Sequence, residues 1–131
     1  MIRRKLSRPV FFKLTQIQMP VGALTSITHR IAGIVLALGI PSGFYAVHLS
    51  LASAQSYEHL TRLANTGLFK AALILFVWAL SHHLLAGVRH LLMDIGIGSH
   101  LASARCSAWS VNAGGVVMAL LAAGVVLCEG L

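Results

Sequence analysis

Acidic residues are scarce in this 131-residue sequence, which has three Asp and Glu against ten Lys and Arg. Charged residues make up only 10% of the chain, whereas a soluble domain carries roughly 25%. Cysteine is scarce too: Cys106 and Cys128 form no C-x-x-C or Cys/His zinc spacing. They lie near opposite ends of one apolar stretch. A helix would place them about 33 Å apart, which excludes a disulfide within it.

Apolar residues dominate instead, at 57% of the chain with a mean hydropathy of +0.84. They form three long stretches, each longer than the ~20 residues that cross a bilayer. We therefore predict an all-α integral membrane protein, a bundle of three transmembrane helices in a single membrane-anchor domain over residues 1–131. The spans are expected at about 22–53, 67–93 and 106–129, after a basic N-terminal segment 1–21 that is unlike a signal peptide.

The basic residues lie between the apolar runs, so they indicate membrane topology and contact with lipid rather than nucleic-acid binding. Eight of the ten lie on the N-terminal side or in the second loop. Positive residues gather on the cytoplasmic side, so we expect a cytoplasmic N-terminus. The N-terminus does not resemble a transit peptide, which favours a multi-pass protein of the bacterial inner membrane. The eight residues are Arg3, Arg4, Lys5, Arg8, Lys13, Arg30, Arg89 and Arg105.

The first span contains Pro41 between Gly39 and Gly43, a pattern that predicts a kink and a close helix contact. A tolerated bend explains the two glycines equally well. Residues 54–66 are polar and are expected to connect the first two spans. The third span is rich in Gly and Ala, which is typical of a packing helix.

Ionisable residues gather at the end of the second span, where His83, Gly87, His90 and Asp94 fall on one helical stripe. Such residues in a membrane segment are costly, so they indicate a functional site. Either His82 or His83 could be the histidine that binds a metal or cofactor, and the residues alone do not exclude His82. We favour His83 because it shares the stripe with Gly87 and His90.

Antiparallel packing would bring Ser26, His29 and Arg30 of the first span to the depth of Arg89 and His90. This geometry suits a b-type haem, with an axial imidazole in an apolar slot and cations near its carboxylates. Gly87 would let the flat macrocycle approach the backbone. A core histidine bonded to a neighbouring helix explains His83 as well, and both readings stay open at this point.

Ser26 and Arg30 are four residues apart on one helical face. A hydroxyl and a guanidinium suit a ligand with carbonyl oxygens, such as a quinone that arrives through lipid. Alternatively, Ser26 bonds to the carbonyl of Gly22 and Arg30 extends to the membrane surface.

At these residues the sequence resembles the cytochrome b (b556) subunits of succinate dehydrogenase, the larger of its two common membrane anchors. The matches are Arg8-Pro9, the pattern S-x-x-H-R-x-x-G at residues 26–33 and H-x-x-x-G-x-R-H-x-x-x-D at residues 83–94. The resemblance implies that His83 is the axial haem b ligand and that a second, small anchor subunit supplies the other. It implies that Ser26 and Arg30 bind ubiquinone and that His29, Arg30 and His90 lie near the haem propionates.

By the same resemblance, the chain is a subunit of a succinate:quinone oxidoreductase. A flavoprotein subunit oxidises succinate and an iron–sulfur subunit passes electrons to the quinone. This chain has no flavin motif and no cysteine cluster, so it is expected to carry neither of those centres. Three alternatives remain open: a fumarate reductase anchor that uses menaquinone, a small transporter with a histidine relay, and a purely structural bundle.

Overall fold

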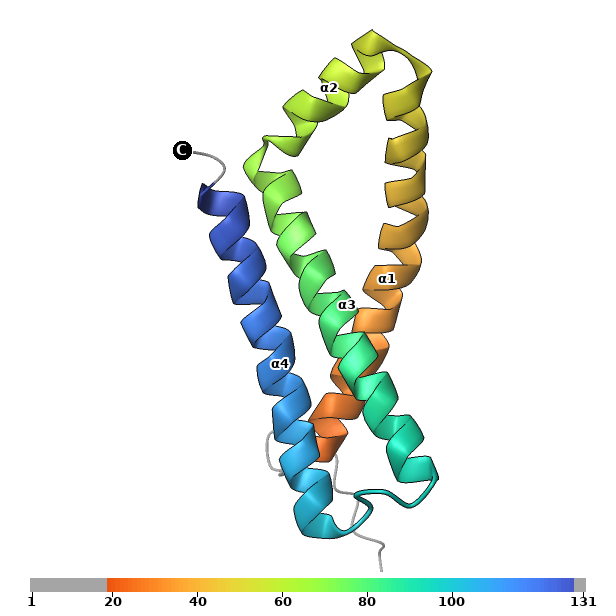
Figure 1. Ribbon diagram of the computed structural model, residues 1–131, viewed down its shortest axis with the longest axis vertical. Helices are drawn as coiled ribbons and strands as arrows, with labels where there is room; N and C mark the ends of the chain where they lie inside the picture. Colours follow the sequence, from red (N-terminus) through yellow and green to blue (C-terminus); the bar gives the residue numbers. More distant parts are fainter. Residues whose placement is uncertain (1–18, 129–131) are drawn as a thin grey trace, which may run out of the picture.

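The computed structural model describes residues 19–128, so most of the basic segment 1–21, including Arg8-Pro9, lies outside the described residues. The described part contains four helices and no strand: α1 (Val21–Ala52), α2 (Ala54–Ala64), α3 (Gly67–Asp94) and α4 (Leu101–Cys128) (Figure 1). Helices α1, α3 and α4 are long and apolar enough to cross a membrane. The predicted all-α bundle with three spans is confirmed.

Two segments differ from the sequence-based expectation. The polar connection is a helix, α2, because Ser53 caps it by accepting a hydrogen bond from the Ser56 amide at 3.1 Å. An exposed pair between Arg62 and Glu58, four residues apart, adds a small stabilisation. Helix α4 begins at Leu101, five residues before the expected start. It follows directly on a turn where Gly96 and Gly98 adopt positive φ angles that glycine allows.

Helix α3 is central and packs against both α1 and α4 (Figure 1). Small residues allow the closest approach, since Ala32 of α1 and Ala79 of α3 are fully buried beside Leu36. Beyond this point α1 and α3 diverge toward α2 (Figure 1). A Cβ atom on Gly39 would lie 2.6 Å from the Phe76 ring, so this glycine makes the predicted close contact, whereas Gly43 faces open space.

Most of the large apolar side chains point outward, including Phe44, Leu68 and Leu120. Such a surface in water would be a strong aggregation hazard, but it suits lipid and partner helices. Cys106 and Cys128 are both exposed free thiols. The chain alone therefore has a small core and a large apolar exterior.

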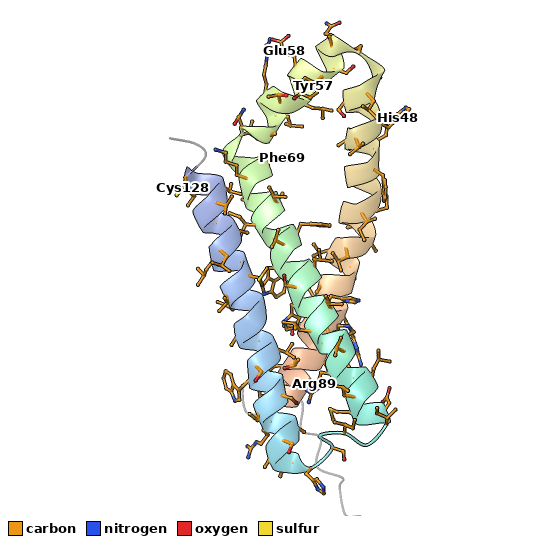
Figure 2. The ribbon with its side chains drawn as sticks, viewed as in Figure 1. His48, Tyr57, Glu58, Phe69, Arg89 and Cys128 are labelled. Atoms are coloured by element: carbon orange, nitrogen blue, oxygen red, sulfur yellow. The ribbon has the colours of Figure 1, made fainter. Side chains whose placement is uncertain are left out.

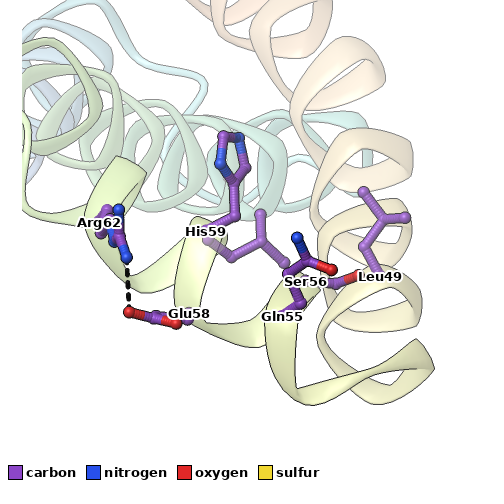
Figure 3. A pocket seen from close by; sticks show the side chains of 7 residues that line it. Leu49, Gln55, Ser56, Glu58, His59 and Arg62 are labelled. Atoms are coloured by element: carbon purple, nitrogen blue, oxygen red, sulfur yellow. Dashed lines mark hydrogen bonds and ion pairs between the residues drawn. The ribbon is translucent and has the colours of Figure 1, made fainter.

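Two hollows lie toward the α2 end of the bundle. An apolar groove of about 790 Å³ separates the diverging parts of α1 and α3, with Gly39 and Phe76 in its wall. A smaller hollow of about 450 Å³ lies between α2 and the end of α1 (Figure 3). There the Arg62–Glu58 pair and His59 line a polar wall. Neither hollow includes the histidines of the predicted site.

Candidate functional site

Helix α3 carries polar residues on two of its faces. The first, here the buried face, contains His82, Ala86 and Arg89, which are 2%, 0% and 7% exposed. The second, here the open face, contains His83, Gly87 and His90, which are half-buried. Neighbouring residues in a helix point about 100° apart, so His82 and His83 belong to different faces although they are adjacent in sequence.

The open face meets α1 in a cluster of three histidines. The rings of His83 and His29 stack with centroids 4.2 Å apart, and the His90 ring lies 5.4 Å from that of His29. Gly33 makes room for this contact, because a Cβ atom there would lie 3.1 Å from Cε1 of His83. Antiparallel packing of α1 and α3 thus brings His29 to the depth of His90, as the sequence predicts, and it also stacks His83 on His29, which the sequence analysis did not predict. Their roles stay predictions.

A hydrogen bond to α1 determines which nitrogen of His83 carries the proton. Nδ1 of His83 lies 3.1 Å from the backbone carbonyl oxygen of His29. A carbonyl oxygen can only accept, so Nδ1 is the donor and Nε2 of the neutral ring retains its lone pair. Metal-binding histidines commonly have this arrangement, in which the second nitrogen donates to a carbonyl and orients the ring.

The three histidines do not form a metal site by themselves. Residues 19–128 contain no group of three or more His, Cys, Asp or Glu side chains placed to hold a metal ion. His83 is therefore suited to supplying one imidazole to an iron whose other ligands come from elsewhere. A haem iron accepts such an imidazole as an axial ligand.

His82 is enclosed on the buried face, which leaves it poorly placed as a ligand. Its Nε2 lies 2.8 Å from the Thr28 hydroxyl, and its ring stacks on Trp78 with centroids 5.4 Å apart. Gly115 of α4 packs against both side chains, since a Cβ atom there would lie 3.2 Å from Cβ of His82 and 3.4 Å from Nε1 of Trp78. With its Nε2 engaged and 2% of its surface exposed, His82 is closed off from an approaching macrocycle. The geometry favours His83 over His82.

Arg89 lies on a different side from the one that we expected. The sequence suggested that it joins His90 in a cationic collar, but its side chain turns to α4 (Figure 2). Its Nε donates to the Ser107 hydroxyl at 3.0 Å and its Nη2 to the Ala104 carbonyl at 3.1 Å. The expectation was wrong because position 89 shares a face with His82 and Ala86, which α4 covers.

Ser26, Arg30 and Asp94 lie around the histidine cluster without contributing to it. Ser26 is half-buried and Arg30 is exposed, on the turns of α1 next to His29. In the part of the chain that the structure describes, the ion pair is Arg62–Glu58, so Arg30 is not paired there. Asp94 is exposed at the end of α3.

Polar residues that the sequence analysis did not single out join the three helices. The Thr25 hydroxyl lies 3.2 Å from the amide oxygen of Asn112 and 3.0 Å from the Val21 carbonyl. Thr28 bonds to His82, as described above. Asn112 could have been noticed as a side-chain amide in the middle of an apolar span, where an unpaired polar group is costly.

Comparison with known proteins adds an independent observation. The model of the family described as "Succinate dehydrogenase/Fumarate reductase transmembrane subunit" matches residues 4–122. The chain is 43% identical over 105 residues to the succinate dehydrogenase cytochrome b556 subunit of Coxiella burnetii, covering 79% of this chain and 84% of that one. The subunits of the same name from Paracoccus denitrificans and Rickettsia bellii are 34% and 31% identical, with 87–89% of each chain covered.

Proposed function

Because the chain belongs to the succinate dehydrogenase/fumarate reductase transmembrane-subunit family, we propose that it binds haem b and forms part of a ubiquinone-reduction site. It is a membrane anchor of succinate dehydrogenase, an oxidoreductase, and it crosses the membrane several times. Its partners in the proposal are a second anchor, an iron–sulfur subunit and a flavoprotein. The relatives cited above are named for succinate dehydrogenase, which favours succinate oxidation over fumarate reduction.

The observation that carries the haem proposal is the hydrogen bond from His83 Nδ1 to the carbonyl of His29. It leaves Nε2 as the ligand atom and holds the imidazole against α1. His83 is half-buried: its ring packs on His29 and Gly33 of α1, and the rest of the open face stays partly exposed. The second anchor would cover that face and supply the other axial ligand. His29 and His90, together with Arg30, would lie near the propionates.

When bound, the haem would supply a reversible one-electron centre, and the protein would supply its ligand, orientation and electrostatic field. Small residues beside His83 fit a flat macrocycle. Gly87 carries no side chain, and a Cβ atom there would make only an ordinary contact, 3.8 Å from Nε2 of His29. The open face thus has an imidazole and a low backbone ridge next to each other.

Ser26 and Arg30 would hold the quinone. Reduction to the quinol takes up two electrons and two protons, and negative charge develops on the carbonyl oxygens. The guanidinium of Arg30 donates hydrogen bonds at any physiological pH, and the Ser26 hydroxyl can donate one. Donors that are held in place before the charge develops stabilise it without reorganisation. Both residues lie within two turns of His29 on α1.

The proposed orientation places this site at the cytoplasmic membrane surface. Helix α1 begins, α3 ends and α4 begins at the same end of the bundle (Figure 1). That end carries Arg30, Arg89 and Arg105, and the basic lead-in precedes it in the sequence. The distribution of positive charge favours a cytoplasmic location for this end, and the bacterial sources of the relatives favour the inner membrane. The soluble catalytic subunits would dock there.

The test is the visible spectrum of the purified complex, recorded oxidised and after reduction by succinate. We expect a b-type absorption band, and we expect His83→Ala to remove it when haem is normalised to flavin. His48→Ala is the matched control, because His48 is exposed near the far end of α1 (Figure 2). A full band in the His83→Ala complex would reject His83 as the ligand.

A further inference from the structure

We propose that His82 is a positioning residue that sets the orientation of the neighbouring His83 imidazole. The proposal rests on the assignment of His83 as the haem ligand. Its first support is a pair of contacts between consecutive residues on both helices. Nε2 of His82 lies 2.8 Å from the hydroxyl of Thr28, and Nδ1 of His83 lies 3.1 Å from the carbonyl of His29.

Two adjacent bonds constrain α3 more than one bond could. The side chains of His82 and His83 leave the helix about 100° apart, so they reach α1 on two sides of the contact. Rotation of α3 about its axis that shortens one bond lengthens the other. A slide by one residue, ~1.5 Å, would also change both distances. Together the bonds fix both the rotation and the register of α3 against α1.

The His82 bond is the more rigid of the two. The ring of His82 stacks on Trp78, Gly115 of α4 packs against both side chains, and only 2% of His82 is exposed. Its partner is fixed as well, because the Thr28 hydroxyl also lies 2.9 Å from the Leu24 carbonyl within α1. When that hydroxyl donates to Leu24, it accepts from His82 Nε2. Breaking the contact would leave polar groups unpaired in an apolar interior, which is costly.

His83 is half-buried and has no comparable enclosure on its open side. The length of its bond to His29 therefore depends on where the buried contact holds α3. That bond influences the basicity and the ring plane of the imidazole, and both influence the spectrum and the reduction potential of a ligated haem. Loss of the Thr28–His82 contact should therefore change haem properties, although neither residue is proposed to touch the haem.

The first test is Thr28→Val in the assembled complex, which removes the hydroxyl and keeps the side-chain shape. Electron paramagnetic resonance of the ferric haem reports the orientation of the axial rings, and a redox titration reports the midpoint potential. We expect retained haem, a shifted resonance and a roughly threefold change in the reduction equilibrium constant, about 28 mV for one electron. Thr28→Ser should restore both signatures. Thr61→Val is the control, since Thr61 bonds only within α2.

A second test approaches His82 from α4. The Cβ atom of Gly115→Ala would lie 3.2 Å from Cβ of His82 and 3.4 Å from Nε1 of Trp78, so His82 or α4 must move. We expect the same two haem signatures to shift. Gly124→Ala is the matched control on the same helix, because a Cβ atom there meets nothing within 4 Å.

The outcomes separate this inference from the proposed function. Wild-type signatures in both Thr28→Val and Gly115→Ala would overturn the inference, and so would Thr28→Ser shifting as far as Thr28→Val. A lower yield of complex with unshifted haem in the assembled fraction would show a structural role only, which also overturns it. Haem retained in His83→Ala would instead reject the proposed ligand. Loss of haem in that variant combined with unshifted Thr28→Val rejects the positioning role alone.

Discussion

On one side of α3, His82 and Arg89 bond to the neighbouring helices α1 and α4, whereas on the other side His83 and His90 stay half-exposed. Both sets of residues come from the same 14-residue polar segment, residues 81–94. The buried polar groups within the described residues all have partners. The comparison shows how one helix separates its polar residues into an internal set that holds the bundle together and an external set that is available to a cofactor.

The largest effect is expected for Arg30→Leu. This substitution removes the guanidinium that we propose donates hydrogen bonds to the quinone beside the open face. We expect quinone reduction to fall by about 10²-fold, the usual effect of removing one preorganised donor to a developing oxyanion. Succinate oxidation with a soluble dye acceptor should continue, because its centres lie in other subunits. Both rates are measured on the same membrane preparation.

Arg62→Leu is the control for this experiment, since Arg62 is an exposed arginine on α2, paired with Glu58 at the other end of the bundle. It should leave both rates near those of the wild type. Equal loss of quinone and dye activity in Arg30→Leu would indicate failed assembly, and an unchanged quinone rate would remove Arg30 from the site.

Arg89→Met tests the buried face of α3. Two charge-assisted hydrogen bonds to α4 are lost. We expect the anchor to lose about 1–3 kcal/mol of stability. The loss stays in this range because helices separated in a membrane also find hydrogen-bond partners. The measurement is the midpoint of thermal dissociation of the complex in detergent. The haem spectrum should stay unchanged, since this side chain bonds to Ser107 and Ala104 of α4. Arg105→Met, at an exposed position of α4, is the control. A lost haem band with unchanged stability would assign Arg89 to the open face.

Gly33→Ala tests how tightly α1 packs against the His83 ring on the open face. Its Cβ would lie 3.1 Å from Cε1 and 3.4 Å from Nδ1 of His83, so the ring or the helix must move. We expect haem occupancy to fall by about fivefold, equivalent to roughly 1 kcal/mol of overpacking. Haem per flavin in the purified complex is the measure. Gly43→Ala on the same helix faces open space and should be neutral. Full occupancy in Gly33→Ala would show that His83 has more freedom than its contacts indicate.

The sequence alone was sufficient to predict the three spans and the region of the polar site. Apolar run length predicts the three spans, helical spacing puts His83 and His90 on one stripe, and antiparallel packing predicts that His29 lies at the depth of His90. It could not place Arg89, because the choice between two faces about 100° apart depends on which side α4 covers. It favoured His83 over His82 through the stripe that His83 shares with Gly87 and His90, but the burial of His82 depends on how α1 and α4 pack around it. Helix α2 was missed because its polar composition resembles that of a loop, although the Ser53 cap was visible.

The smallest expected effect concerns the contact between Thr25 of α1 and Asn112 of α4, at 3.2 Å. Hydrogen bonds between transmembrane helices average about 0.6 kcal/mol, because the separated helices also find partners in the membrane. Asn112→Leu should therefore lower the stability of the detergent-solubilised complex only slightly, with normal haem and quinone activity. A double-mutant cycle with Thr25→Val measures the coupling directly. A coupling near zero would mean that the Thr25–Asn112 contact adds nothing to the packing of α1 against α4. A large loss of haem would mean that internal polar contacts reach the open face through routes other than His82.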